Sequence, residues 1–206
     1  MTGLVNPTLG SSGRPVRSAA SAAQPDGSAA KILDVNSAGE ILWWTPGTRT
    51  ATRGTNSFTY TVVADTFWPS LVTLPFNQPA NLFPGGPSQS NANGFLAGHL
   101  FGTFVAPAGG TISLTVGADD DVWVFINNTL VLDQGGVKAF GATTSTITGL
   151  TPGTHRIDVF FADRHRVQSA LVFGADVRLN PVPEAASLAL LAAGLVGLGA
   201  LARRRV

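Results

Sequence analysis

Apolar and polar residues alternate along most of the chain between residues 94 and 179, with the period of two that is typical of β-strands. The clearest runs are FLAGHLFGTFVA, TISLTVG, VWVFI, TLVLD, STITGL, HRIDVFFAD and ALVFGADVRL. Only Asn127 and Asn128 separate VWVFI from TLVLD. Because asparagine tolerates positive φ, this spacing predicts a tight two-residue hairpin.

Shorter pieces of the same pattern precede residue 94. KILDVNSAGEILWW leads into a Thr-Pro-Gly turn sequence, so we interpret Trp43 and Trp44 as the end of a strand. NSFTYTVV, residues 56–63, predicts another strand, and a loop rich in Pro, Asn and Gly follows at residues 75–93. Together, about eight or nine short strands separated by turn residues predict an all-β chain, an antiparallel β-sandwich over residues 31–180.

The C-terminus carries a long apolar run. AASLALLAAGLVGLGALA, residues 185–202, is an uncharged stretch of 18 residues. A helix of this length spans about 27 Å, close to the hydrocarbon thickness of a bilayer. Arg203, Arg204 and Arg205 follow, and cationic residues stay on the cytoplasmic side. We therefore predict a single C-terminal transmembrane helix with the rest of the chain outside; an ordinary tail anchor or a buried helix is the alternative.

This segment resembles a known sorting signal. Val182, Pro183 and Glu184, then the apolar run and the arginine cluster, are similar to the PEP-CTERM motif, with Ala185 where the family usually has a second proline. The resemblance implies a Gram-negative bacterium with extracellular polysaccharide, and processing by the membrane protease exosortase. It also implies that Pro183 and Glu184 are recognised near the cleavage site. Residues 181–206 would then be the sorting signal of a protein that reaches the cell surface or extracellular matrix.

The N-terminal part of the given sequence does not show the export signal expected of a sorted surface protein. Residues 1–30 are rich in Ser, Ala and Gly and contain no apolar stretch of the kind found in export signals. A segment of this composition buries little apolar surface, so we expect it to be disordered. An exported protein needs a signal, and we interpret its absence as a mis-assigned start codon or a trimmed chain. The alternative, a cytoplasmic protein, fits poorly with the C-terminal helix.

Composition and charge narrow the possible partners. Residues 31–183 hold eight Lys or Arg against ten Asp or Glu, a net charge of 8 − 10 = −2. Because no basic stripe with interleaved aromatic residues is present, nucleic acid is not an expected partner. The chain has no cysteine, which excludes disulfides, thiolate catalysis and Cys-based zinc sites. Exported domains often depend on disulfides or a bound metal for stability. Because disulfides are excluded here, a bound metal is favoured.

Three adjacent carboxylates suggest where that metal binds. Asp119, Asp120 and Asp121 lie between two strongly apolar strands. Adjacent carboxylates repel one another and resist burial. A cation relieves this repulsion, and hard oxygen donors suit Ca²⁺ best. The spacing therefore makes these residues candidate metal ligands, with a solvent-exposed Asp-rich turn as the alternative.

The surrounding residues resemble the fibro-slime domain. GADDDVWVFINNTLVLDQGGV followed by LTPGTHRIDVFFADRH carries the similarity, which covers residues 94–179. It implies the lectin-like β-sandwich of the anthrax protective antigen and the yeast flocculins. In the flocculin-like relatives an adjacent Asp pair holds Ca²⁺, and the ion binds vicinal sugar hydroxyls; here that pair would be Asp119 and Asp120. Relatives often carry Gly at the position of Asp121 and His at that of Lys138.

Further residues are candidates for the same site. Asp133 and Asp163 each close a strand, which makes them possible ligands or carbohydrate contacts. Trp68 precedes a proline in a loop, which makes its ring a candidate for stacking on a sugar, with a structural aromatic as the alternative. Histidines 155 and 165 with nearby Asp and Ser residues resemble a catalytic triad only by chance, because no nucleophile-elbow motif accompanies them. Adjacent Asp residues also rarely flank a sugar as a glycosidase requires.

These observations favour one function over two alternatives. We expect a non-enzymatic surface or matrix protein, sorted by exosortase, with a Ca²⁺-dependent site for extracellular polysaccharide or another glycan. The first alternative is a purely structural matrix protein without ligand, in which the Asp cluster only shapes a turn. The second is a hydrolase of matrix polymers, which no motif in the sequence supports.

Overall fold

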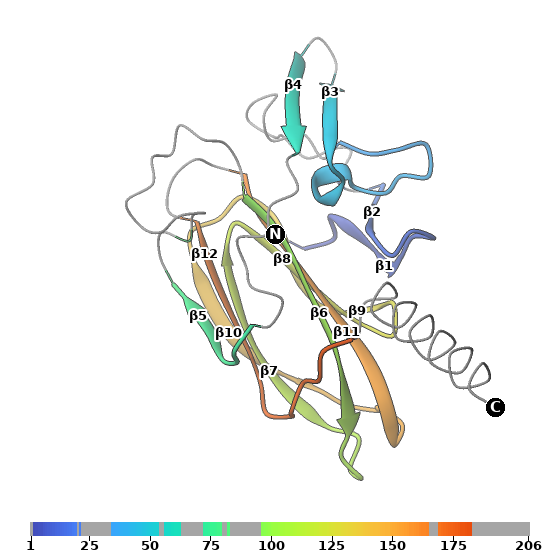
Figure 1. The fold of residues 1–206 in the computed structure, drawn as a ribbon, viewed down its shortest axis with the longest axis vertical. Helices are drawn as coiled ribbons and strands as arrows, with labels where there is room; N and C mark the ends of the chain where they lie inside the picture. The colour runs from blue at the N-terminus through green and yellow to red at the C-terminus, as the bar shows by residue number, and fades with distance from the viewer. Residues whose placement is uncertain are drawn as a thin grey trace, which may run out of the picture.

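The computed structural model describes residues 2–19, 21, 34–53, 56–62, 72–79, 82, 96–164 and 169–182. Within these ranges the regular elements are strands, apart from one 3-10 helix, η3 (Leu42–Trp44) (Figure 1). The strands are β1 (Val5–Leu9), β2 (Pro15–Arg17), β3 (Gly47–Arg53), β4 (Asn56–Val62), β5 (Phe76–Gln78), β6 (Leu96–Ala106), β7 (Ile112–Asp119), β8 (Asp121–Ile126), β9 (Thr129–Gln134), β10 (Gly141–Ile147), β11 (Gly153–Asp163) and β12 (Ala170–Ala175).

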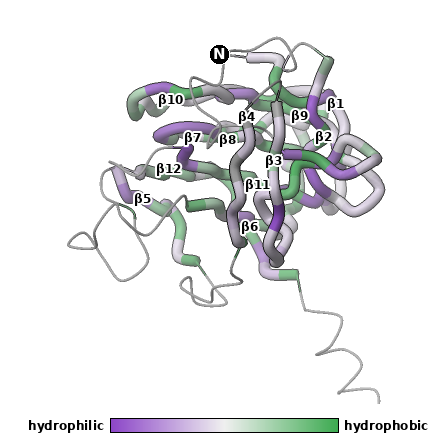
Figure 2. Tube along the Cα trace, turned by 90° about the horizontal axis from the view of Figure 1, so that it is seen from above, coloured by the Kyte–Doolittle hydropathy of each residue, from purple (hydrophilic) through white to green (hydrophobic). Residues whose placement is uncertain are grey.

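The described strands form two large sheets and a separate hairpin. The six-stranded sheet has the order β2-β1-β9-β8-β11-β6, and the four-stranded sheet has the order β10-β7-β12-β5. All pairs in these sheets are antiparallel. Figure 2 shows the two sheets as neighbouring layers, and in Figure 1 the β3–β4 hairpin projects away from them. The prediction of an all-β fold with antiparallel sheets is confirmed.

The two sheets pack face to face around one hydrophobic core. Strand β8 shows how the sequence produces this arrangement. Val122, Val124 and Ile126 belong to the core between the sheets, whereas Trp123 and Phe125 belong to a second cluster on the opposite face. This division follows from the side-chain period of two in a strand. Every residue of β8 is buried, so the six-stranded sheet is covered on both of its faces at this strand.

The turn between β8 and β9 confirms the hairpin predicted from the sequence. Asn127 and Asn128 have φ angles of 48° and 66°, the left-handed values that a tight two-residue turn requires. Residues 75–93 were predicted to be a loop, but the start of this range contains strand β5. This strand pairs with β12 at the edge of the four-stranded sheet.

The N-terminal segment covers the second face of the six-stranded sheet, so the disorder expected for residues 1–30 is wrong for residues 2–19. Strand β1 pairs with both β2 and β9. Leu4 and Val5 are buried in the same cluster as Trp123 and Phe125. An N-terminal segment is ordered when it adds a strand to a sheet, and a few buried side chains achieve this despite a polar average composition.

The buried carboxylate of Glu40 holds the N-terminal segment in place through hydrogen bonds. Glu40 Oε1 accepts a hydrogen bond from the Ser12 N–H (2.8 Å), and Oε2 accepts bonds from Asn36 Nδ2 (2.8 Å) and the Ser12 hydroxyl. The bonds from Ser12 and Asn36 lower the pKa of Glu40 below its usual value. A Cβ at Gly10 would collide with the Glu40 carboxylate, so this close approach needs glycine. The carboxylate thereby joins the β1–β2 turn to the segment before η3.

The tryptophan pair forms the short helix η3 and not the strand end that the sequence suggested. The Thr45 N–H donates to the Leu42 carbonyl (3.0 Å), which closes the 3-10 turn. The turn directs Trp44 onto the sheet, where its Nε1 donates to the Gly98 carbonyl of β6 (2.9 Å). Its ring meets Phe160 edge-on, with centroids 5.0 Å apart. Tertiary packing of the indole thus outweighs the local strand pattern.

The described chain ends beside strand β6. Asn180 and Thr103 exchange two backbone hydrogen bonds of 2.8 and 2.7 Å. The described residues contain no helix that is both long and apolar enough to cross a membrane. The transmembrane helix predicted at residues 185–202 lies outside the described residues, as do Pro183, Glu184 and the arginine cluster.

Candidate metal centre

Four aspartates gather where three strands begin or end. Strand β7 ends at Asp119 and β8 begins at Asp121, with Asp120 between them, while Asp163 ends β11. All four side chains are buried. The Asp119–Asp120 peptide bond is cis. The carboxylates are therefore not a solvent-exposed turn, which was the structural alternative to a metal site.

Three of these carboxylates face one another. Ligand oxygens of Asp119, Asp120 and Asp163 all lie within 4.8 Å of one another. The register of the sheets brings them together: β8 pairs with β11 through Asp121 and Ala162, next to Asp163, and the Asp120 N–H bonds the Ala162 carbonyl at 3.3 Å. We call Asp119, Asp120 and Asp163 the acidic cluster.

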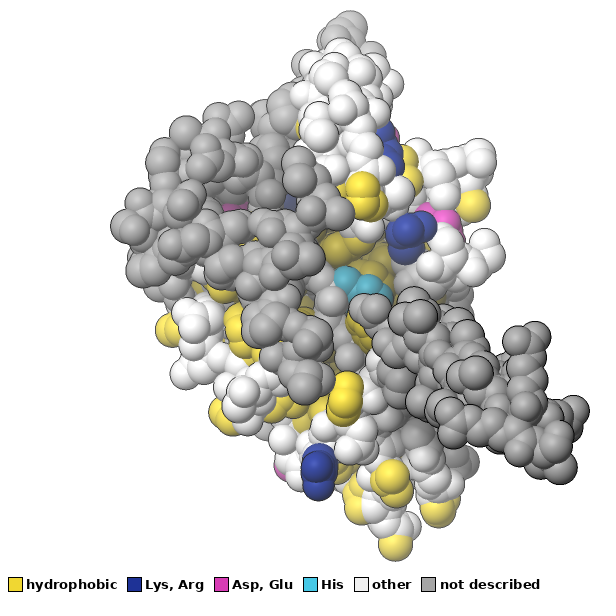
Figure 3. Space-filling view, in the orientation of Figure 1, with side chains coloured by type: hydrophobic (Ala, Val, Ile, Leu, Met, Phe, Trp, Pro, Cys, Tyr) yellow, Lys and Arg dark blue, Asp and Glu magenta, His cyan; other side chains and the backbone are white. Residues whose placement is uncertain are grey.

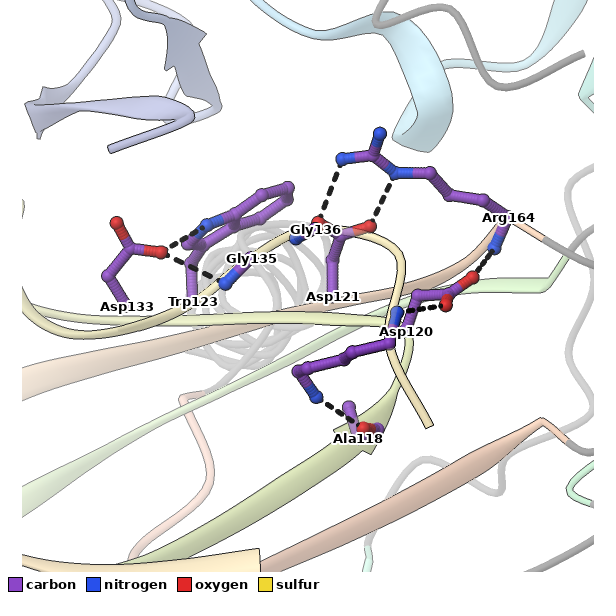
Figure 4. A network of polar contacts seen from close by, with 9 residues as sticks. Ala118, Asp120, Asp121, Trp123, Asp133, Gly135, Gly136 and Arg164 are labelled. Carbon is purple, nitrogen blue, oxygen red and sulfur yellow. Dashed lines mark hydrogen bonds and ion pairs between the residues drawn. The ribbon is translucent and has the colours of Figure 1, made fainter. Parts of the chain in front are cut away.

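Backbone donors orient the central carboxylate. Asp120 Oδ1 accepts from the Lys138 N–H (2.9 Å), and Oδ2 accepts from the Arg164 N–H (2.8 Å) (Figure 4). Asp120 is thus held in place by backbone donors from two loops.

Asp121 is committed to a different partner. Arg164 Nε donates to its Oδ2 (2.7 Å) and Arg164 Nη2 to its Oδ1 (2.9 Å), and the Gly136 N–H also donates to Oδ1. Burial raises the pKa of Asp121, and the charge and hydrogen bonds of Arg164 oppose that rise. Both oxygens serve the ion pair shown in Figure 4, so the structure groups Asp163, and not Asp121, with Asp119 and Asp120.

A lysine lies at the border of the acidic cluster. Lys138 Nζ donates to the Ala118 carbonyl, one residue before Asp119. Burial lowers the pKa of Lys138, and the negative charges of Asp121, Asp120 and Asp119 oppose the shift. The ammonium group is therefore within electrostatic range of the cluster and offsets part of its charge.

Asp133, the other aspartate proposed from the sequence, lies apart from the cluster. Its Oδ1 accepts from Trp123 Nε1 and from the Gly135 N–H, both at 3.0 Å, and its Oδ2 accepts from the Gly3 N–H at 2.6 Å. These three bonds join the N-terminal segment to the β8–β9 hairpin. Trp68, the proposed stacking residue, lies outside the described residues.

Among the described residues, His155 and Asp158, which were considered as members of a catalytic triad, bond other partners. His155 Nδ1 contacts Asn127 Nδ2 (2.7 Å), and its Nε2 contacts the Thr151 carbonyl (2.8 Å). Asp158 instead bonds His99 Nε2 (2.9 Å) and Arg156. Burial raises the pKa of Asp158, but the bonds from His99 and Arg156 outweigh it and lower the pKa overall. His165 lies outside the described residues.

The donor set of the acidic cluster fits a hard divalent cation. Three carboxylates supply only oxygen ligands, as Ca²⁺ prefers, and Ca²⁺ takes six to eight such ligands in total. Buried carboxylates this close together repel one another unless a cation lies among them. The roles of Arg164 and Lys138 could not be predicted from the sequence. Arg164 bonds Asp121 from 43 residues away and Lys138 bonds Ala118 from 20 residues away, and such distant pairs leave no local pattern.

A double antiparallel sheet with a buried acidic cluster at its strand ends defines the class of domain. Residues 48–183 match the family model of the PA14 domain, which covers well over half of the chain. The chain therefore belongs to the PA14 domain family. Residues 181–205 match the PEP-CTERM protein-sorting motif, which confirms the resemblance seen in the sequence.

Relatives and solved structures match shorter parts. Protein psiE of Dictyostelium discoideum is 52% identical over 56 residues, 26% of this chain and 11% of psiE. Protein psiR of the same organism is 48% identical over 54 residues, 25% of this chain and 5% of psiR. These relatives are fibro-slime-like proteins, as the resemblance in the sequence suggested. The chain thus spans a small fraction of these relatives.

Among solved structures, a PA14 sugar-binding domain from an RTX adhesin matches 41% of this chain and 46% of that chain, at 22% identity and a TM-score of 0.33. A β-glucosidase from Kluyveromyces marxianus matches 43% of this chain and 12% of that chain, at 14% identity and a TM-score of 0.35.

Proposed function

We propose that this chain is an exported surface protein whose PA14 domain binds Ca²⁺ and, through the ion, a glycan. The observation that carries the proposal is the acidic cluster, in which buried oxygens of Asp119, Asp120 and Asp163 lie within 4.8 Å of one another. No catalytic role is part of this function. The ion would be held by these carboxylates, and its remaining positions would be open to water or to sugar hydroxyls.

The same proposal covers how the protein reaches its site of action. The PEP-CTERM motif supports export and surface sorting. Its apolar run, residues 185–202, would tether the domain to the membrane, with the arginines on the cytoplasmic side. Exosortase would then recognise Pro183 and Glu184 and release the domain to the surface or matrix of a Gram-negative cell.

Thermal unfolding of the full chain with and without Ca²⁺ tests the ion site. Extracellular modules bind Ca²⁺ with Kd of about 0.1 to 1 mM, so 10 mM Ca²⁺ should stabilise the fold by about 1.4 to 2.7 kcal/mol. For a chain of this size that is a rise of about 3 to 10 °C in Tm. In the variant Asp119→Asn/Asp120→Asn the rise should disappear.

Asp133→Asn is the matched control, because it alters a half-buried hydrogen-bonding carboxylate outside the cluster. We expect a lower Tm in this variant but an unchanged calcium shift. If 10 mM Ca²⁺ leaves the Tm of the unmodified chain where it was, the ion-dependent function is wrong, and a structural matrix protein is the better interpretation.

A further inference from the structure

The C-terminal segment leaves the sandwich along the edge of β6. Thr103 and Asn180 form an antiparallel bridge with two backbone hydrogen bonds. Gly102 favours this close approach, because a Cβ there would lie 3.0 Å from the Asn180 carbonyl oxygen. The exit point of the chain is therefore fixed on the sandwich at Thr103.

Large hydrophobic side chains are exposed on both sides of this exit point. Phe101 is 47% exposed and Val105 is 62% exposed, each two residues from Thr103 along β6. Among the described residues, Val137 is the other large hydrophobic side chain with comparable exposure. Figure 3 shows hydrophobic side chains at the surface around the lower end of β6. Arg178, two residues before Asn180, is also exposed.

The chain beyond the exit point is short. Four residues, 181–184, separate Asn180 from the predicted membrane helix at 185–202. Five residue steps of 3.3 to 3.6 Å reach at most about 18 Å. The headgroup region occupies about 5 to 8 Å on each side of the hydrocarbon core. A tethered sandwich would therefore stay close to the bilayer at the point where Asn180 pairs with Thr103.

We propose that, before cleavage, the edge of β6 rests on the lipid headgroups through Phe101 and Val105. Apolar side chains at this depth gain by burial in the headgroup boundary, and Arg178 adds attraction to anionic lipids. The inference rests on the tethered state of the proposed function. Leu96, which pairs with Asp163, lies seven residues from Thr103, or about 23 Å along the strand. The acidic cluster thus lies well along the strand from the exit point at Thr103.

The absence of cysteine allows a direct test. The full chains Val105→Cys and Thr146→Cys are made in a host without the sorting protease, labelled with bimane and incorporated into nanodiscs of phosphatidylcholine and phosphatidylglycerol. Thr146 is the matched control, because it is exposed on β10, the edge strand of the other sheet. Spin-labelled lipid at headgroup depth should quench the label at position 105 at least twofold more than the label at 146.

The readouts separate the tether from the surface. Co-elution of the chain with nanodiscs reports the tether, and a chain that stays outside the discs overturns both the tether and this inference. Equal quenching at positions 105 and 146 in incorporated chains overturns the membrane-facing surface alone. In Val105→Cys, an added Arg178→Gln exchange should lower quenching on anionic discs and leave it unchanged on discs of phosphatidylcholine only.

Discussion

At the residue scale, the charge of Lys138 lies close enough to the acidic cluster to oppose the binding of the proposed ion. Its N–H orients Asp120, and its ammonium group bonds the Ala118 carbonyl beside Asp119. A fixed cation near a Ca²⁺ ion repels it, while it stabilises the carboxylates when no ion is bound. In the proposed calcium site, Lys138 would therefore lower the affinity for the ion, and it would stabilise the three carboxylates when no ion is bound.

Replacing the ammonium by an apolar group should tighten calcium binding. For Lys138→Met we expect a Kd for Ca²⁺ at least tenfold lower than that of the unmodified chain, a difference of about 1.4 kcal/mol. Isothermal titration calorimetry at physiological ionic strength measures it. Lys138→Arg keeps the charge and serves as the control, with a Kd within about threefold of the original. Equal affinity in the methionine variant would show that the ammonium does not act on the ion.

At the scale of elements, the N-terminal segment stabilises the sandwich. Removal of residues 1–19 takes away β1 and β2 and exposes the face that holds Trp123. Loss of the buried Leu4 and Val5 alone should lower the free energy of unfolding by about 3 to 6 kcal/mol. Urea unfolding followed by tryptophan fluorescence measures the loss. Thr8→Ala, an exposed change on β1, should stay within about 0.5 kcal/mol.

The same elements show what sequence can predict. Strands between residues 96 and 175 follow a clear alternation, and the two asparagines predicted the β8–β9 turn. β1 and β2 escape detection because they are short, contain proline and owe their order to contacts with distant aromatic side chains. The Asp119–Asp120 pair is visible in the sequence. Its grouping with Asp163 depends on the pairing of β8 with β11, which no local pattern encodes.

For the whole molecule, the proposed tether and the acidic cluster together suit display of many copies on one surface. A glycan held by one ion and a few hydroxyl contacts binds weakly to a single domain. Copies on a common membrane raise the effective concentration, and avidity can exceed the single-site affinity by about 10² to 10⁴. Figure 3 shows few charged side chains on the visible described surface, so non-specific ionic attraction should contribute little there.

A printed glycan array read with two forms of the same full chain tests this argument. Chains in detergent micelles present single copies, and chains in liposomes present many. We expect half-saturation of the responding glycans at least a hundredfold lower for the liposomes, with release by a calcium chelator in both forms. Asp119→Asn/Asp120→Asn liposomes should not be retained. Retention that persists in chelator would assign binding to another surface, and no retention of liposomes on any glycan would leave the domain a structural component of the matrix.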